Sequence, residues 1–235
     1  MALHVLLTGA TGMIGKGVLL ECLESSAVAK VLSVGRQSLG MTHPKLEELI
    51  HRDFTDFSTS QEQISAFKPG ACFHCMGVSS LGMNETDYSR LTYDVTKSLA
   101  DTIYLANDRA VFTYVSGAGT DSSEKGSLMW ARVKGRTENY VINRGFGGAY
   151  AFRIGMVIPV KGVKSKSGWV NAIYTITRPI YGLFQKLDSV VTSAQVGQVM
   201  IKLAVARTPR QSTGLANASQ VQGEFLEAKQ IKALA

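Results

Sequence analysis

The segment Leu3-His4-Val5-Leu6-Leu7-Thr8-Gly9-Ala10-Thr11-Gly12-Met13-Ile14-Gly15 decides the fold of this 235-residue chain. An apolar run ends in three glycines with the spacing Gly9-x-x-Gly12-x-x-Gly15, and an apolar helical pattern begins at Val18. We therefore predict a strand, a tight turn and a helix. Glycine lets the chain leave the strand sharply and lets backbone approach a phosphate, and the N–H groups of a helix start bind anions. In this context the triad favours a dinucleotide site over a plain turn. The residues expected to contact the dinucleotide here are Gly9, Thr11, Gly12, Met13, Ile14 and Gly15.

Composition points to an ordinary globular protein. Hydrophobic residues make up 45% of the chain and charged residues 18%. Because no apolar run reaches the length of a membrane span, we expect no such span, and because the first strand starts at once, we expect no signal peptide. The odd cysteine count (Cys22, Cys72 and Cys75) favours reduced thiols and a cytoplasmic setting.

Cys72-Phe73-His74-Cys75 has the C-x-x-C spacing of zinc and redox sites. There is no second cysteine pair, and the motif lies in an apparently buried strand. We therefore expect neither a metal site nor redox chemistry here, and we interpret His74 as a packed strand residue rather than a base.

The net charge of +7 is unevenly distributed. Between residues 161 and 186 there are five basic residues and no acidic one: Lys161, Lys164, Lys166, Arg178 and Lys186. This segment is either a solvated loop or a surface for an acidic substrate or another anion. Nucleic acid is not expected as a partner, because no basic platform interleaved with aromatic residues is visible.

Short apolar runs alternate with helical patterns along most of the chain. The expected strands cover residues 3–8, 30–34, 46–54, 71–77, 110–115 and 149–154, and the later helices cover 60–67, 85–107, 125–143 and 192–206. This alternation predicts an α/β fold with a doubly wound parallel sheet, which binds ligands at the carboxyl ends of its strands. We expect a single domain over residues 1–235, with the basic segment 156–190 as a small substrate-side lid. The tail after Thr208 has little pattern.

Residues at the expected strand ends predict how the cofactor is held. An acid after the second strand would bind the 2′-hydroxyl of the adenosine ribose, whereas the charge and fork of Arg36 suit a 2′-phosphate. Lys16 is a candidate second cation for that phosphate. We therefore expect NADP rather than NAD. Asp53 and Phe54 are expected beside the adenine, and Gly77 where the chain passes close to the cofactor.

The order of these motifs, followed by Ser116, a helix with Lys134 and the run Arg153-Ile154-Gly155, resembles the short-chain dehydrogenase/reductase superfamily. It is most similar to the atypical NmrA-like and epimerase-like members. The resemblance extends from Leu3 to about Ala206 and implies the doubly wound Rossmann fold of that superfamily.

A serine, a tyrosine and a lysine do the chemistry in such enzymes. The resemblance implies that Ser116 holds the substrate oxygen and that Lys134 grips the ribose and lowers the pKa of the tyrosine. The tyrosine should stand four residues before the lysine, where this chain has Trp130. An indole N–H donates a hydrogen bond but is no acid or base near neutral pH.

Three accounts of this difference compete. In the first, Lys134 itself is the acid/base group, with a pKa that desolvation lowers, as a resemblance to isoflavone-reductase-like proteins implies. Tyr93, which stands four residues before Lys97, could instead enter the site from the preceding helix. In the third account the protein binds the cofactor without hydride transfer.

We therefore expect an NADP(H)-dependent oxidoreductase that acts on a carbonyl or hydroxyl compound of low molecular mass. The alternatives are a non-catalytic NADP(H)-binding regulator with a protein partner, and a sugar-nucleotide epimerase or dehydratase. A homodimer through the helices that begin near Glu85 and Lys125 is compatible with the sequence.

Overall fold

The structure, a computed structural model, describes residues 2–160, 189–207 and 223–235. Within these residues the centre of the fold is a seven-stranded sheet with the order β3-β2-β1-β4-β5-β6-β9, in which all neighbours are parallel. The strands are β1 (Leu3–Thr8), β2 (Val28–Gly35), β3 (Leu46–Ile50), β4 (Ala71–His74), β5 (Val111–Gly117), β6 (Gly148–Ile154) and β9 (Glu224–Glu227). The predicted doubly wound parallel sheet is confirmed.

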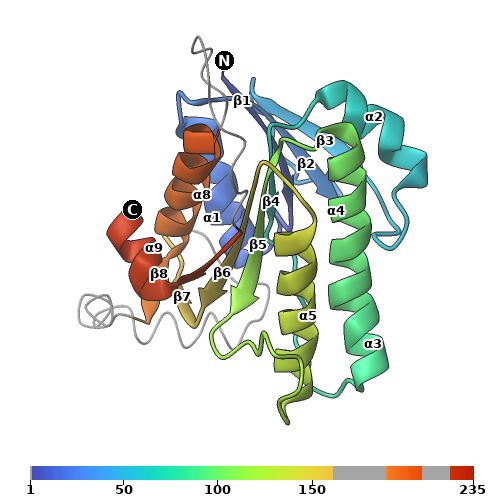
Figure 1. Cartoon of the computed structure of the whole chain (residues 1–235). Helices are drawn as coiled ribbons and strands as arrows, with labels where there is room; N and C mark the ends of the chain where they lie inside the picture. The colour runs from blue at the N-terminus through green and yellow to red at the C-terminus, as the bar shows by residue number, and fades with distance from the viewer. Residues whose placement is uncertain (1, 161–188, 208–222) are drawn as a thin grey trace, which may run out of the picture.

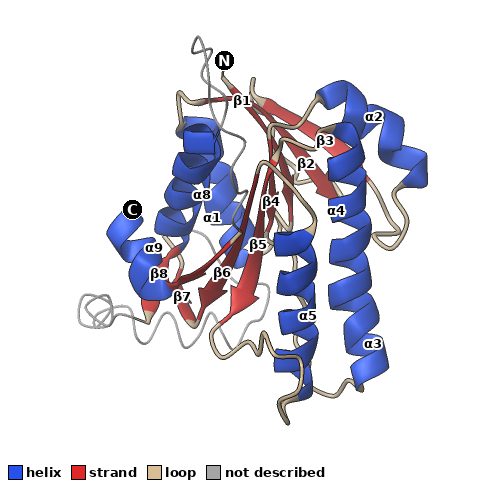
Figure 2. Cartoon of the chain, viewed as in Figure 1, coloured by secondary structure: helices blue, strands red, loops and turns tan. Residues whose placement is uncertain are grey.

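Helices cover both faces of this sheet (Figures 1 and 2). One layer contains α1 (Met13–Glu24), α8 (Ser193–Arg207) and α9 (Ala228–Leu234). The other contains α2 (Gln61–Phe67), α4 (Val95–Ala106) and α5 (Met129–Asn143), and α3 (Glu85–Ser89) leads into α4. The strand side chains alternate between two cores: Val5 and Leu7 lie in the α1 layer, and Leu6 in the α4 layer. Burial on both faces explains why the strands are almost wholly apolar.

Most elements lie where the sequence predicts them, but several ends differ. β3 stops at Ile50 rather than at Phe54, because His51 turns inward and its ring stacks on Phe57 at 4.3 Å. β4 stops at His74 instead of Gly77. The helix over 85–107 is interrupted by a π-helical turn, Arg90–Asp94, between α3 and α4. α5 begins at Met129, not at Lys125.

The segment before α5 is a loop built around one carboxylate. Asp121 accepts hydrogen bonds from the backbone N–H groups of Ser123, Lys125 and Gly126 at 2.6–3.1 Å. These bonds lower the pKa of Asp121 and hold residues 121–126 outside the helix.

Three short strands and one helix of the described residues are not predicted from the sequence. β9 and α9 fall in the tail that has no apparent pattern, yet Leu226 and Ile231 are buried in the core. β7 (Met156–Ile158) and β8 (Val190–Thr192) pair as a small parallel sheet at either end of the basic segment. The basic residues between 161 and 186 lie outside the described residues.

Candidate functional site

The glycine turn between β1 and α1 has the geometry that the sequence predicts. Gly9 has φ +76°, and a Cβ at Gly9 would lie 2.6 Å from the carbonyl of Cys75. A Cβ at Gly15 would lie 2.2 Å from the carbonyl oxygen of Gly9. Gly12 caps α1 without a side-chain hydrogen bond, and no acid stands in the first turn of the helix. The helix start therefore presents N–H groups to an anion.

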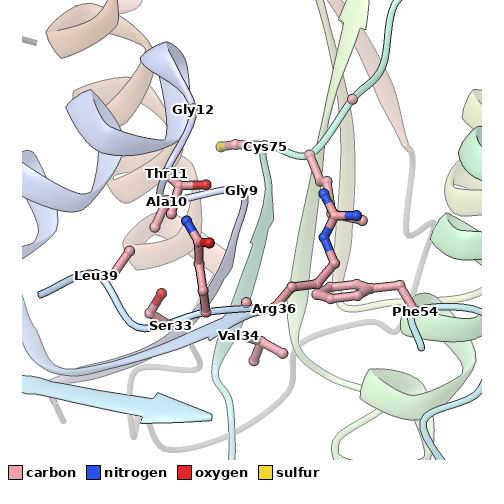
Figure 3. Close-up of a pocket in the computed structure, with 14 residues that line it drawn as sticks. Gly9, Ala10, Thr11, Gly12, Ser33, Val34, Arg36, Leu39, Phe54 and Cys75 are labelled. Atoms are coloured by element: carbon pink, nitrogen blue, oxygen red, sulfur yellow. The ribbon is translucent and has the colours of Figure 1, made fainter. Parts of the chain in front are cut away.

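A cleft of about 320 Å³ opens beside this turn, at the carboxyl ends of β1, β2 and β4 (Figure 3). It lies at the switch point of the sheet, where the strand order reverses between β1 and β4. The lining residues are Gly9, Ala10, Thr11, Gly12, Ser33, Val34, Gly35, Arg36, Gln37, Leu39, Phe54, Cys75, Met76 and Gly77. The structure thus brings together six of the residues predicted from the sequence: Gly9, Thr11, Gly12, Arg36, Phe54 and Gly77. Met13, Ile14 and Gly15 follow directly, as the first turn of α1.

Arg36 follows β2 and reaches into the cleft from the wall that also carries Phe54 (Figure 3). The side chain is exposed, and no carboxylate of the described residues pairs with it. Lys16, the candidate second cation, is placed differently, because its Nζ lies 3.0 Å from the Sδ of Met41.

The side chains of Asp53 and Phe54, in the loop after β3, lie in different environments. Phe54 is buried and lines the cleft, whereas Asp53 caps a turn in which its Oδ1 accepts from the N–H and the hydroxyl of Thr55 at 2.9 and 2.6 Å. These bonds lower the pKa of Asp53. The contact of Asp53 with adenine stays a prediction.

A second cleft of about 330 Å³ is lined by the same loop as the first one. Cys75, Met76 and Gly77 line the first cleft, and the next residues along the chain, Val78 to Ser80, line the second. The remaining lining residues of the second cleft are Tyr88, Gly117, Ala118, Trp130, Lys134, Ile154 and Gly155. A Cβ at Gly77 would meet no atom of the described residues within 4 Å, so space for an approaching ligand is left at this point of the loop.

Lys134, on α5, is one of the residues that line this second cleft. Its Nζ lies 3.4 Å from the hydroxyl of Tyr114 and 5.4 Å from the centroid of that ring. Burial lowers the pKa of Lys134, and its interactions with Tyr88 and Glu138 act against that shift.

Trp130, at the position where the resemblance predicts a tyrosine, stands one helical turn before Lys134. Its indole lies over the loop after β5: Cβ atoms at Gly117 and Gly119 would be 3.7 and 3.6 Å from the ring. The aromatic surface therefore forms one wall of the second cleft, and this wall carries no acid/base group.

Ser116, the predicted partner of the substrate oxygen, is buried near the end of β5. Its Oγ lies 3.1 Å from the Oγ1 of Thr120, and Thr120 donates to the carbonyl oxygen of Gly117 at 2.7 Å. Because the Thr120 proton is used in that bond, the Ser116 hydroxyl is the donor to Thr120. Ser116 does not line the second cleft in this arrangement.

The helix before β5 does contribute a tyrosine to the site, and it is Tyr88 rather than Tyr93. Tyr93 lies beneath the guanidinium of Arg136 at 4.3 Å and packs edge-on against Tyr140. Lys97 pairs with Asp101 at 2.7 Å. The Tyr-x-x-x-Lys spacing indicates Tyr93 and Lys97, whereas Tyr88 belongs to no motif in the sequence.

The C-x-x-C strand is structural. His74 is fully buried between Thr8 and Thr96, with Nδ1 2.7 Å from Thr8 Oγ1 and Nε2 3.1 Å from Thr96 Oγ1. Burial lowers the pKa of His74 to about 3. Cys72 and Cys75 belong to opposite cores and are free thiols whose pKa burial raises. Among the described residues no cluster could hold a metal ion.

The model of the NAD dependent epimerase/dehydratase family matches residues 5–123, about half of the chain and the part that contains the glycine turn. The chain belongs to this family. The resemblance to epimerase-like short-chain dehydrogenase/reductases is thereby confirmed.

Two curated relatives share low sequence identity with this family member. It is 27% identical to Protein fmp52-2, mitochondrial, of Aspergillus terreus over 168 residues, which cover 70% of this chain and 71% of the relative. It is 26% identical to Protein HTATIP2 of Rattus norvegicus over 155 residues, or 66% and 62% of the two chains.

The fold is shared with a solved structure, Bordetella bronchiseptica WbmG in complex with NAD. The TM-score is 0.65 at 12% identity, over 99% of this chain and 76% of WbmG. No helix in the described part of this family member is long and apolar enough to cross a membrane.

Proposed function

We propose that this protein binds NADP(H) across the two clefts and catalyses hydride transfer on a carbonyl or hydroxyl compound of low molecular mass. The observation that carries the proposal is the loop that the two clefts share. One loop, residues 75–80, lines the phosphate-binding cleft with its first half and the cleft of Lys134 with its second half. A dinucleotide that crosses the switch point of such a sheet would have its adenosine in the first cleft and its nicotinamide in the second.

The residues present fit this cofactor. The uncapped start of α1 would hold the pyrophosphate, Arg36 the 2′-phosphate, and Phe54 would pack against the adenine. Lys134 would hold the nicotinamide ribose and keep positive charge beside the reacting oxygen. When bound, the reduced nicotinamide supplies the hydride.

The substrate oxygen needs a hydrogen-bond donor. Ser116 serves if its hydroxyl turns away from Thr120, and Ser79 and Ser80 already line the cleft. Turnover in Ser116→Ala and in a Ser79→Ala/Ser80→Ala variant would show which serine acts.

The proposal is tested by titration of the protein with NADPH and with NADH, observed by tryptophan fluorescence. Trp130→Phe shows how much of the signal comes from the second cleft. We expect tight NADPH binding, weak NADH binding, and oxidation of NADPH in the presence of an aldehyde, ketone or quinone. If neither nucleotide binds, the proposal fails.

A second candidate is a non-catalytic NADP(H)-binding regulator. Two observations favour it: the Ser116 hydroxyl is bonded to Thr120, and Trp130 stands at the expected tyrosine position. The serine and the tyrosine that superfamily chemistry uses are therefore not presented to the cleft from their usual positions. In that case a panel of carbonyl compounds would consume no NADPH, while NADPH and NADP would change the affinity for a protein partner. The cytoplasmic setting and a homodimer are further parts of the proposal. Gel filtration with light scattering measures the oligomeric state.

A further inference from the structure

Two contacts, one helical turn apart, hold α3 beside α5. Arg132 Nη2 lies 2.6 Å from Glu85 Oε2, and Arg136 donates a hydrogen bond to Ser89 Oγ. Glu85 and Ser89 are the two ends of α3, and Tyr88 lies between them. Lys134 lies between Arg132 and Arg136 on α5. The two contacts therefore fix the position of Tyr88 relative to Lys134.

Tyr88 is the tyrosine of this region that lines the second cleft with Lys134. Its side chain is otherwise buried, at 2% exposure for the whole residue. Tyr114 touches Lys134 from the protein side, where it is 1% exposed and packed against His74. Tyr114 therefore contacts the ammonium from the core, while Tyr88 is part of the wall of the cleft that a substrate would enter.

Electrostatics agrees with this geometry. Burial raises the pKa of Tyr88, so its hydroxyl carries a proton at neutral pH, as a proton donor must. The charge of Lys134 lowers the pKa of Tyr88 and so stabilises the tyrosinate left after proton transfer. This is the relationship that superfamily enzymes establish between a tyrosine and a lysine on one helix.

We propose that Tyr88 is the catalytic acid/base residue, which replaces the tyrosine missing at Trp130 from a different helix. The inference rests on the proposed function. In reduction, the bound reduced nicotinamide would supply a hydride to the carbonyl carbon and be oxidised, and the C=O π-electron pair would move to the oxygen. That oxygen takes the proton of Tyr88, which leaves tyrosinate beside the Lys134 ammonium. Water then returns a proton to Tyr88, and the oxidation runs through the same steps in reverse.

Turnover by the wild-type protein, Tyr88→Phe and Tyr93→Phe tests the assignment. We expect Tyr88→Phe to lower kcat by about 100-fold or more while the Kd for NADPH stays the same. Tyr93→Phe, on the same helical segment but outside the cleft, should stay close to wild type. Trp130→Tyr in the Tyr88→Phe protein should recover part of kcat, because it restores a tyrosine beside Lys134.

Wild-type kcat in Tyr88→Phe would overturn the inference and leave the proposed function standing. A wild-type protein that consumes no NADPH would instead remove the proposed function, and the Tyr88 assignment with it. The two failures are therefore distinguished by the wild-type measurement.

A readout without turnover uses protein labelled with [13Cζ]tyrosine. The Tyr88 resonance is the one lost in Tyr88→Phe, and its titration midpoint is followed by NMR as the pH is raised. We expect Lys134→Met to raise this midpoint by about one pH unit, because the neighbouring positive charge is lost. Lys97→Met, which removes a lysine paired with Asp101, should leave it in place. An unchanged midpoint in Lys134→Met would contradict the proposed pairing.

Discussion

The ammonium of Lys134 lies 3.4 Å from the hydroxyl of Tyr114 and 5.4 Å from the centroid of the Tyr114 ring. Tyr114 lies on β5, an inner strand of the sheet, and is almost wholly buried, so its ring is a rigid support for the flexible lysine side chain. This contact positions Lys134 in the wall of the second cleft, where burial lowers the pKa of Lys134.

Lys134→Met should abolish hydride transfer, with a loss in kcat/KM of about 100-fold or more. The same change should leave the fold as stable or up to about 2 kcal/mol more stable, since a charge held for function is removed from a buried position. Steady-state kinetics and urea unfolding at pH 7 measure the two effects. Lys97→Met is the matched control and should retain turnover.

Arg36→Asp should weaken NADPH binding about 10- to 100-fold, because charge-assisted hydrogen bonds to the 2′-phosphate contribute roughly 1.5–3 kcal/mol. NADH binding should change much less. Calorimetric titration of both nucleotides gives the ratio of the two Kd values. Arg109→Asp, at an exposed arginine just before β5 and so at the amino ends of the strands, is the control for net charge. An unchanged ratio in Arg36→Asp would mean that Arg36 does not contact the 2′-phosphate.

Gly77→Ala and Gly15→Ala should have different effects, because Gly77 leaves space for the ligand whereas Gly15 is required by the fold. A Cβ at Gly77 meets no atom of the described residues within 4 Å, whereas a Cβ at Gly15 lies 2.2 Å from the Gly9 carbonyl oxygen. Gly77→Ala should therefore keep the wild-type Tm and bind NADPH more weakly. Gly15→Ala should lower Tm even without nucleotide. Thermal scans with and without NADPH measure both, and a Gly77→Ala protein with wild-type affinity would show that the cofactor does not approach this position.

Glu138→Ala should destabilise the fold by up to about 3–5 kcal/mol, because it leaves the largely buried Arg153 with only the longer ion pair to Glu227 at 3.7 Å. Glu138 has a fully buried side chain that pairs with Arg153 at 2.6 Å and links α5 to β6. Glu47→Ala breaks the exposed Lys30–Glu47 pair and should cost less than about 1 kcal/mol. Denaturant unfolding of both variants tests the difference, and a loss for Glu138→Ala no larger than for Glu47→Ala would contradict it.

His74 should make the fold sensitive to mild acid. Burial lowers its pKa from 6.5 to about 3, so the unfolded chain binds a proton in the window between these values and the folded chain does not. Stability therefore falls as the pH drops through this window, by roughly 2–3 kcal/mol between pH 7 and pH 4.5. In His74→Asn, this contribution to the pH dependence of the free energy of unfolding should be absent. Equal slopes in unfolding titrations of the two proteins would show that His74 accepts a proton without unfolding.

Local sequence determined the first half of the site. The glycine turn, the strand before it and the helix after it are adjacent in the chain, and their conformations follow from backbone sterics and a short apolar pattern. Arg36 and Gly77 could be placed from the sequence because both follow strands, and the carboxyl ends of parallel strands meet at one edge of a sheet.

Tertiary structure decided the second half. Tyr88 lines the same cleft as Lys134 because Arg132 and Arg136 on α5 hold α3, and neither contact has a signature in the sequence. β9 pairs with β6 although the paired residues, such as Tyr150 and Glu224, are far apart in the sequence. The sequence of a strand of only four residues does not predict this long-range pairing. Ser116 stands near the end of β5, as the pattern predicts, and Asp53 stands in the loop after β3 rather than at the strand end, and their side chains bond to Thr120 and Thr55. The order of residues along the chain sets which backbone reaches the cleft, but the direction of each side chain is set by neighbours that only the packed fold supplies.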